Sequence, residues 1–323
     1  MKKIYYIIIG LIIVIGSIFI FIKTNNKNTN LTTIKVAEVT HSAFYTPFYI
    51  SIKNNYFKDN NIDIDLILTS GANNVIAAVL SKDVDIGLCG PEATIYVYNE
   101  GEKDYIKTFA GLTKRDGQFI VSRTKIDNFK LENLIGKEVL GGRPGGMPII
   151  NFYNALKNEN IKGVNTNDTV DFANLTSAFL TGTGDFVNLF EPNATKIEKM
   201  NKGYVVASVG MYAGEVPYTA FNARTSYIEN NKELINNFKD AINKGLKFTK
   251  NNDSKDIAKI IIDLFPNTSI EDLTTIIERY KNADSWLDNT FITEEMFKNL
   301  EDMMIDSKLL KKYVPYKDLI INE

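Results

Sequence analysis

Cysteine, histidine and tryptophan are nearly missing from this sequence, which has one residue of each among 323. The single cysteine, Cys89, excludes an intramolecular disulfide and a cysteine-based metal cluster, and we interpret it as a small buried apolar residue. Lipoprotein processing is excluded too, because no cysteine follows the N-terminal apolar run. An excess of charge is also missing: 37 basic and 39 acidic side chains give a net charge of -2, which argues against a nucleic-acid partner.

A long apolar run lies at the N-terminus. Lys2 and Lys3 precede an uncharged stretch from Ile4 to Ile22, and Lys23 closes it. As a helix this stretch spans about 30 Å, the thickness of a bilayer core. Because no small-residue cleavage site follows, we expect a transmembrane anchor, or an uncleaved signal, over residues 1–23. Residues 24–32 are polar and predict a tether, with the body of the protein outside the cell membrane.

From Thr33 onwards, strand-like and helix-like patterns alternate. Apolar residues at every second position predict strands at 34–39 and 62–68, and Pro47 and Pro91 each open a helix. Such alternation is typical of a mostly parallel α/β sheet, which binds ligands beyond the carboxyl ends of its strands. A second sheet is expected from strands at 120–122, 138–140, 169–172, 186–190 and 204–208. Everything beyond Ser226 is helical in pattern and is expected to pack around the first sheet.

A glycine-rich loop runs from Gly141 to Gly146 and precedes a helix expected at 148–157. Glycines before a helix expose backbone N–H groups that hold an anionic or carbonyl oxygen, and Arg143 would reinforce such a site. The spacing matches neither a Walker loop nor a dinucleotide fingerprint, which argues against ATP and NAD as ligands. The alternative interpretation is a tight turn between a strand and a helix.

An ordered series of short motifs carries a resemblance to a known family. The series comprises Val36-Ala37-Glu38, His41-Ser42 with Phe44-Tyr45-Thr46-Pro47, Asp85-Ile86-Gly87 with Gly90-Pro91-Glu92, the glycine loop, and Phe190-Glu191-Pro192. It resembles the SsuA/ThiY-type periplasmic-binding family, whose members bind sulfonates, taurine, nitrate or thiamine pyrimidine precursors. The resemblance covers residues 33 to about 316. It implies a periplasmic-binding-protein type II fold of two α/β lobes with a ligand cleft between them, lobe 1 from 33–116 and 220–323 and lobe 2 from 117–219.

The resemblance also implies a function. The chain would be the extracytoplasmic solute-binding protein of an ABC importer, a monomer with permease and ATPase subunits as partners and with neither cofactor nor metal. Hinges near 112–119 and 216–220 would let one lobe close on the other.

The cleft residues are likewise implied by the resemblance. For Phe44 and Tyr45 the alternative is core packing, and for Ser42 and Ser70 it is helix capping. The expected ligand-binding residues are His41, Ser42, Phe44, Tyr45, Ser70, Gly71, Gly90, Pro91, Glu92, Gly142, Arg143, Gly145, Gly146, Met147, Glu191 and Tyr218.

Carboxylates at the expected cleft bear on the kind of ligand. A sulfonate site needs N–H and O–H donors, whereas a buried anion beside Glu92, Glu191 or Glu215 is strongly disfavoured. Carboxylates suit a nitrogen-bearing aromatic solute such as a thiamine pyrimidine precursor, stacked on Phe44, Tyr45, Tyr212 or Tyr218. A sulfonate, taurine or nitrate ligand remains the alternative within the family, and a solvated cap or surface salt bridge is the alternative for each glutamate.

Two other classes of protein compete with this interpretation. Yeast-type hydroxymethylpyrimidine phosphate synthases resemble this chain in general features of the first lobe. Those enzymes carry a cysteine-rich motif and a reactive histidine. This chain has one histidine, His41, and no G-x-S-x-G elbow, so we predict that it is not an enzyme. A membrane-anchored receptor domain is the third class.

Overall fold

The computed structural model describes residues 31–69, 71–142 and 144–322. The anchor expected over residues 1–23 and nearly all of the tether lie outside these ranges, as do Ser70 and Arg143. Among the described residues, none of the helices combines the length and the apolar character that crossing a membrane requires.

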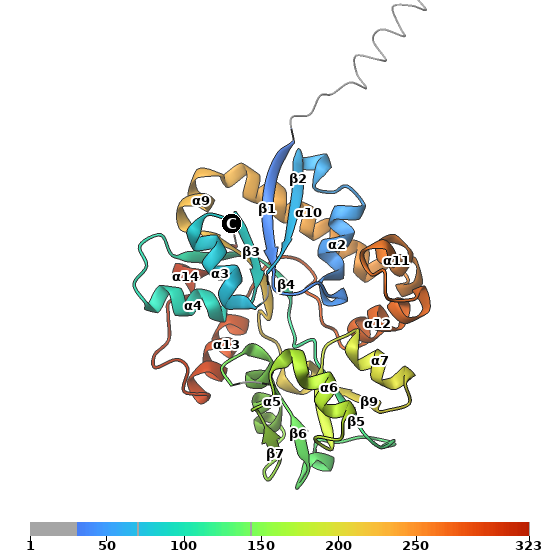
Figure 1. The fold of residues 1–323 in the computed structure, drawn as a ribbon. Helices are drawn as coiled ribbons and strands as arrows, with labels where there is room; N and C mark the ends of the chain where they lie inside the picture. The colour runs from blue at the N-terminus through green and yellow to red at the C-terminus, as the bar shows by residue number, and fades with distance from the viewer. Residues whose placement is uncertain (1–30, 70, 143, 323) are drawn as a thin grey trace, which may run out of the picture. The chain divides into compact units, whose positions relative to one another are not determined.

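The first sheet has five strands in the order β2-β1-β3-β10-β4 (Figure 1). β1 (Thr32–Glu38) pairs parallel to β3 (Ile86–Cys89), and β2 (Ile62–Leu68) flanks β1. β10 (Thr219–Arg224) runs antiparallel to both β3 and β4 (Ile106–Thr113). The sheet is therefore mixed: β1 and β3 are parallel, whereas β10, which comes from a distant part of the chain, is antiparallel to both of its neighbours.

The second sheet also has five strands, in the order β7-β6-β8-β5-β9. These are β5 (Phe119–Ser122), β6 (Glu138–Leu140), β7 (Asn165–Asn167), β8 (Phe186–Leu189) and β9 (Tyr204–Ser208). The strand predicted at 169–172 is wrong: the strand lies at β7, and Phe172–Asn174 forms a short 3-10 helix. Asn167 ends β7 because its side-chain Oδ1 accepts hydrogen bonds from the Thr169 backbone and hydroxyl, which turns the chain away from the sheet.

Helices accompany both sheets, and each sheet with its helices is called a lobe below. Around the first sheet, which forms lobe 1, lie α2 (Thr46–Lys53), α3 (Ala72–Ser81), α4 (Glu92–Asn99), α9 (Thr225–Asn230) and α10 (Lys232–Asn251). With the second sheet, which forms lobe 2, lie α5 (Met147–Asn158), α6 (Leu175–Leu180), α7 (Asn193–Lys199) and α8 (Val209–Ala213). The chain ends in α11 (Ser254–Ile261), α12 (Ile270–Asn282), α13 (Glu294–Asp306) and α14 (Tyr316–Leu319).

Phenylalanine rings fill the core of lobe 1 between the sheet and α10. Phe221 of β10 lies with its ring centroid 5.2 Å from Phe48 and 5.0 Å from Phe238, both in edge-to-face geometry. α10 approaches α2 closely at Gly245, where a Cβ would lie 2.1 Å from both the Pro47 carbonyl oxygen and Ser51 Oγ. Glycine at this position therefore permits the packing of the two helices.

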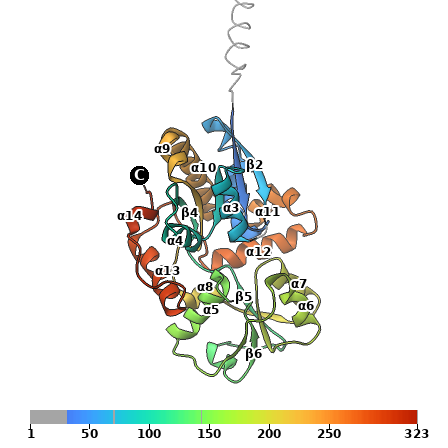
Figure 2. The ribbon, with the colours of Figure 1, turned by 60° about the vertical axis from the view of Figure 1, so that its left-hand side comes forward.

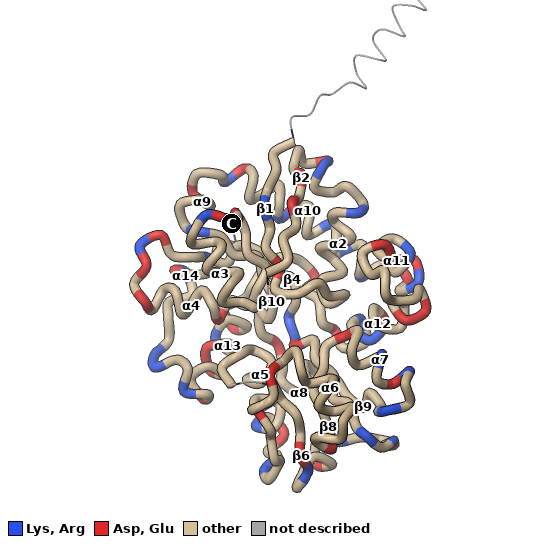
Figure 3. Tube along the Cα trace, viewed as in Figure 1, with Lys and Arg blue, Asp and Glu red and all other residues tan. Residues whose placement is uncertain are grey.

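The chain passes between the two sheets twice. Residues 114–118 join β4 to β5, and α8 with residues 214–218 joins β9 to β10. Most C-terminal helices pack around lobe 1: α10 and α11 contact α2, and α14 contacts β4. α12 and α13 also lie where the lobes meet, and α13 contacts α5 of lobe 2 (Figure 2). Acidic and basic residues are interspersed over both lobes (Figure 3), and several opposite charges pair between these helices and lobe 2, such as Lys199 with Asp272 and Lys157 with Asp306.

Candidate functional site

Aromatic rings from both lobes meet at Phe44. This residue belongs to a short 3-10 helix (Ala43–Tyr45) directly after the first strand. Its ring centroid lies 5.8 Å from Phe190 of lobe 2, 5.8 Å from Tyr218 and 5.1 Å from Tyr280. The four rings form what we call the aromatic cluster, and it brings together two of the predicted cleft residues, Phe44 and Tyr218.

Backbone contacts hold the two lobes together beside the aromatic cluster. The Ser42 hydroxyl donates to the Glu191 carbonyl oxygen at 3.5 Å, and the Glu191 N–H donates to the Tyr280 hydroxyl at 3.3 Å. Ser42 Oγ also accepts from the Phe44 N–H, so the capping role and the cleft position expected for Ser42 coexist. At Gly117, a Cβ would lie 2.7 Å from the Phe44 ring and 2.9 Å from the Phe190 ring. Only glycine fits between these rings in this arrangement.

Glu92, one of the expected ligand-binding residues, lies buried at the first turn of α4. Its Oε2 has no hydrogen-bond partner among the described residues. Burial raises the pKa of the Glu92 carboxyl to about 7, although the backbone N–H groups of Glu92 and Ala93 act in the opposite direction. A Cβ at Gly90 would lie 1.9 Å from Oε2, so Gly90 is needed for this position of the carboxylate. Tyr45 is buried as well, which raises the pKa of its hydroxyl, and the charge of Glu92 contributes to this rise.

A second buried carboxylate, Asp116, was missed by the sequence analysis. It lies in the 114–118 connection between the lobes, and its Oδ1 accepts from the Gln118 N–H at 2.6 Å. Its Oδ2 makes no hydrogen bond of ordinary geometry with the described residues. Burial raises the pKa of Asp116 to about 8, opposed by the Gln118 N–H and the Tyr218 hydroxyl. Two acids on the lobe 1 side of the aromatic cluster thus have unused hydrogen-bonding capacity.

Neutral polar side chains with unused atoms lie on the lobe 2 side. Asn188 is fully buried in β8, and neither atom of its side-chain amide has a partner among the described residues. The Gln118 amide nitrogen donates to the Asn188 carbonyl oxygen at 3.4 Å, while Gln118 Oε1 is unpartnered. Asn188 is the one polar residue in the apolar strand Phe186-Val187-Asn188-Leu189, and this was a signal that could have found it.

Glu191 is buried next to the aromatic cluster, but its carboxylate is fully engaged. It accepts from the Thr195 N–H at 2.8 Å and the Thr195 hydroxyl at 2.9 Å, and it pairs with Arg279 Nη1 at 2.8 Å. Glu215 is likewise engaged, by Arg115 at 3.0 Å and Lys114 at 3.8 Å. Of the three glutamates expected in the cleft, Glu92 alone has a buried carboxylate oxygen without a hydrogen-bond partner in the described residues.

The glycine loop forms the turn into α5, with Gly146 as the N-cap and Met147 buried behind it. Gly142 and Gly145 adopt positive φ angles of 82° and 85°, which requires glycine. Gly145 lines a surface cavity of about 460 Å³ between α5 and the end of α13, together with residues such as Tyr153 and Leu309. The loop is therefore placed at a surface cavity of its own, and no described contact joins it to Phe44 or Glu92.

Two of the expected ligand-binding residues are helix N-caps: Gly71 precedes α3 and Pro91 precedes α4.

His41 belongs to a separate hydrogen-bond network. Its Nδ1 lies 2.8 Å from Glu38 Oε1, and its Nε2 lies 3.0 Å from the Leu264 carbonyl oxygen. The hydrogen bond to Glu38 raises the pKa of His41, although burial acts against it. Both ring nitrogens are thus committed to holding the loop in place.

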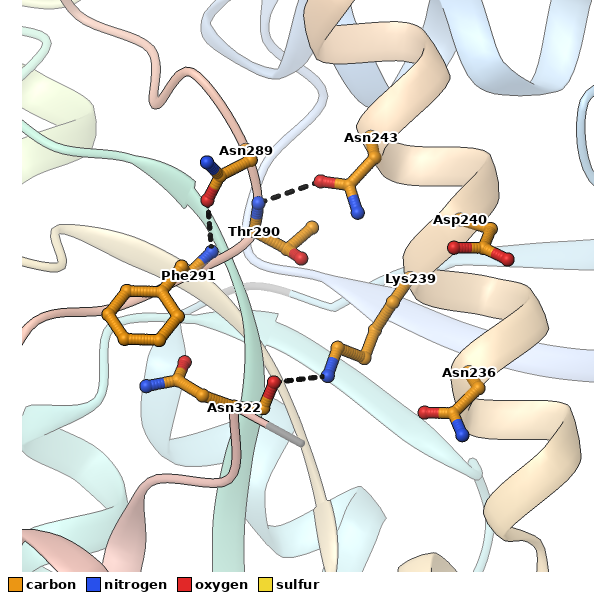
Figure 4. Close-up of a pocket in the computed structure, with 8 residues that line it drawn as sticks. All are labelled: Asn236, Lys239, Asp240, Asn243, Asn289, Thr290, Phe291 and Asn322. Atoms are coloured by element: carbon orange, nitrogen blue, oxygen red, sulfur yellow. Dashed lines mark hydrogen bonds between the residues drawn. The ribbon is translucent and has the colours of Figure 1, made fainter.

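A second surface cavity, also of about 460 Å³, lies on lobe 1 beside α10 (Figure 4). Its amide oxygens bind backbone groups: Asn243 Oδ1 accepts from the Thr290 N–H and Asn289 Oδ1 from the Phe291 N–H. The Lys239 ammonium donates to the Asn322 carbonyl oxygen at 3.0 Å. These groups are held by the protein itself, so the cavity is a polar surface groove. Elsewhere in the described part of the chain, no cluster of three His, Cys, Asp or Glu side chains could hold a metal ion.

Comparison with known proteins identifies the class of fold. The aliphatic sulphonate binding protein SsuA from Escherichia coli superposes with a TM-score of 0.69 at 13% identity, covering 88% of this chain and 96% of that one. The ligand binding component of an ABC-type import system from Staphylococcus aureus gives a TM-score of 0.69 at 14% identity over 90% of this chain and 97% of that one. The two lobes therefore form the periplasmic-binding-protein fold, as the sequence predicted.

The family follows from closer matches. The model of the NMT1/THI5-like family matches residues 42–255. "Putative binding protein YtlA" of Bacillus subtilis is 39% identical over 314 residues, which cover 96% of this chain and 94% of that protein. This chain belongs to the NMT1/THI5-like family, and the resemblance found in the sequence is confirmed.

Proposed function

We propose that this chain is the extracytoplasmic solute-binding protein of an ABC importer and encloses a small aromatic solute bearing nitrogen between its lobes. One observation carries the proposal: Glu92 and Asp116 are buried, each has a carboxylate oxygen without a hydrogen bond of ordinary geometry in the described residues, and both act on the pKa of Tyr218 in the aromatic cluster. Buried acceptors without donors are costly, and a ligand with N–H groups removes that cost.

The aromatic cluster supports a flat ligand. The ring centroids of Phe44 in lobe 1 and Phe190 in lobe 2 lie 5.8 Å apart, with the ring planes tilted by 59°, and opening the lobes would separate them. A planar ring that enters between them gains stacking contacts to both lobes at once. A ligand that contacts both lobes stabilises the closed state over the open state, which is the requirement for a closing receptor.

Relatives support the transport role. Structural neighbours include a ligand-binding component of an ABC-type import system and a sulphonate-binding protein. A sulfonate is the alternative ligand, but it could bind beside Glu92 and Asp116 only if both acids kept their protons. An enzymatic role is disfavoured because His41, the one histidine of the chain, has both ring nitrogens engaged by Glu38 and Leu264.

The apolar run at residues 1–23 supports attachment to the cell membrane with lobes 1 and 2 outside. Fractionation of cells that express the full-length chain tests this. We expect the protein in the membrane fraction and digestible by protease added to spheroplasts; recovery in the cytosol would contradict it.

A ligand panel tests the binding role. We expect a hydroxymethyl-bearing aminopyrimidine to raise the melting temperature of the full-length protein, with methanesulfonate, taurine and nitrate inactive. Glu92→Gln removes a carboxylate acceptor from the site and should weaken binding roughly tenfold or more. Glu100→Gln, an exposed change at the end of the same helix, is the control and should bind like the unmodified protein. Stabilisation by sulfonates without aminopyrimidines would overturn the proposal.

A further inference from the structure

We infer that the enclosed solute is a cation that pairs with the buried carboxylates of Glu92 and Asp116, to which no basic side chain of the described residues is paired. The inference rests on the proposed function and adds the charge of the solute to it.

Both acids lie within electrostatic reach of one phenol. Burial raises the pKa of the Tyr218 hydroxyl, and the charges of Asp116 and Glu92 both raise it further. Glu92 Oε2 and Asp116 Oδ2 make no hydrogen bond of ordinary geometry with the described residues, although the Tyr218 hydroxyl lies close enough to Asp116 to act on its pKa. Two acceptors therefore approach the same buried region from α4 and from the connection between the lobes.

The basic side chains around this region pair with acids other than Glu92 and Asp116. Arg115, the neighbour of Asp116, places Nη2 3.0 Å from Glu215 and 3.5 Å from Asp284. Lys114 lies 2.8 Å from Asp284. Arg279 pairs with Glu191 and Glu198. Within the described ranges, no ion pair joins a lysine, arginine or histidine to Glu92 or Asp116, so the protein itself supplies no counter-charge to them there.

The other titratable groups around the two acids are neutral. Glu92 is surrounded by Tyr45, Cys89, Tyr96 and Tyr218, and burial raises the pKa of each. Asp116 faces Tyr218 and Tyr280, whose pKa values are raised by burial as well. These groups are uncharged near neutral pH, and they leave a buried pair of acids that is either protonated or balanced by something bound.

Charge balance then selects the ligand. An isolated carboxylate in an apolar interior takes up a proton rather than remain charged. A cation between the lobes lets both carboxylates stay ionised and bind it by charge-assisted hydrogen bonds. Their protons leave to solvent when the cation enters a closed protein. A neutral solute leaves the protons in place, and an anion requires them.

Isothermal titration calorimetry on the full-length protein tests whether the preferred solute is positively charged. The probes are an aminopyrimidine and its N-methylated, permanently charged derivative. We expect the charged probe to bind more tightly, with an affinity that rises between about pH 6 and about pH 9, by up to tenfold per pH unit for each proton displaced. Heats measured in buffers of different ionisation enthalpy give the number of protons released. In Glu92→Gln and Asp116→Asn proteins, the pH slope should shrink.

The outcomes separate the two proposals. Tighter binding of the uncharged probe, with an affinity that falls as pH rises, would overturn the cation inference and leave the proposed function standing. Binding of neither probe would overturn both, and so would binding of sulfonates alone.

A ligand-free measurement guards against variants that fail to fold. The one tryptophan, Trp286, donates its indole N–H to the Phe44 carbonyl oxygen at 2.7 Å and lies 5.9 Å from Tyr280. Its fluorescence should report closing. Because the pKa values of Glu92 and Asp116 are raised only when buried, the closed form is favoured at low pH and lost as pH rises through about 7 to 8. A pH-independent signal in the unmodified protein would contradict the inference, and any slope left in the double variant belongs to His41.

Discussion

Arg279 and Glu191 form an ion pair that joins the two lobes. Arg279 belongs to α12, which packs against lobe 1, and Glu191 follows β8 in lobe 2. The carboxylate is buried and lies 2.8 Å from Nη1, and the same guanidinium also pairs with Glu198. This side of the interface is held by protein groups before any solute enters.

Replacing Arg279 should therefore weaken the closed form. Arg279→Gln leaves Glu191 buried with Thr195 as its partner, at a cost of about 2–3 kcal/mol, because the guanidinium is partly exposed. Small-angle scattering should show a larger radius of gyration, and ligand binding should weaken. Lys199→Gln removes a more exposed pair with Asp272 and is the matched control, with an expected effect below about 1 kcal/mol. An equal radius of gyration and equal ligand affinity for the two variants would show that Arg279 does not stabilise the closed form more than a surface ion pair does.

Gly117 should control closure without controlling folding. Gly117→Ala places a Cβ against the rings of Phe44 and Phe190, and overpacking of this kind costs about 1–3 kcal/mol. Because the clash exists only when the lobes meet, we expect ligand affinity to fall roughly five- to 150-fold. Thermal unfolding without ligand should change much less. A large loss of stability with unchanged affinity would contradict this role.

Gly245 gives the opposite expectation. Gly245→Ala forces α10 away from Pro47 and Ser51 of α2, which should lower the free energy of unfolding by about 1–3 kcal/mol. Urea denaturation measures this change, and Lys247→Ala, an exposed change on the same helix, is the control. Solute affinity of the folded Gly245→Ala protein should stay unchanged, since the position lies within lobe 1. An unfolding curve that matches the control would show that the helices adjust without cost.

His41 should make stability depend on pH. Glu38 raises the pKa of His41 above its ordinary value of 6.5, so the stabilising contact is fully present below that value. It is lost as pH rises through the raised pKa of the folded protein. In His41→Asn, the difference in unfolding free energy from the unmodified protein should shrink from mildly acidic to mildly alkaline pH. A constant difference would mean that the charge of His41 does not contribute.

The sequence predicted the elements best where one face of a strand is buried. β2 has the predicted bounds, Ile62–Leu68, because apolar and polar residues alternate along it. The strand at β7 was misplaced because its residues, Asn165-Thr166-Asn167, are polar and the pairing with β6 alone makes it a strand. β4 was not predicted, because all of its residues except Lys107 are buried and its apolar residues show no period of two.

The site was predictable in part for a similar reason. Phe44, Glu92 and Tyr218 were expected in the cleft because they lie near strand ends, and the structure buries all three. The Glu191 carboxylate pairs with Arg279, whose position 88 residues later no local pattern reveals. Asp116 lies in a connection whose conformation is set by both lobes, so its burial follows from the assembled structure alone.

The place of β10 between β3 and β4 has a consequence for how the chain is made. Residues 219–224 leave the ribosome after all the strands of the second sheet, yet they occupy a central position in the first. Lobe 2 can be completed from a continuous stretch, while the earlier strands of lobe 1 must wait for their missing neighbour. During synthesis, the part of the protein that begins first is thus finished last, and its unpaired strand edges need protection until then.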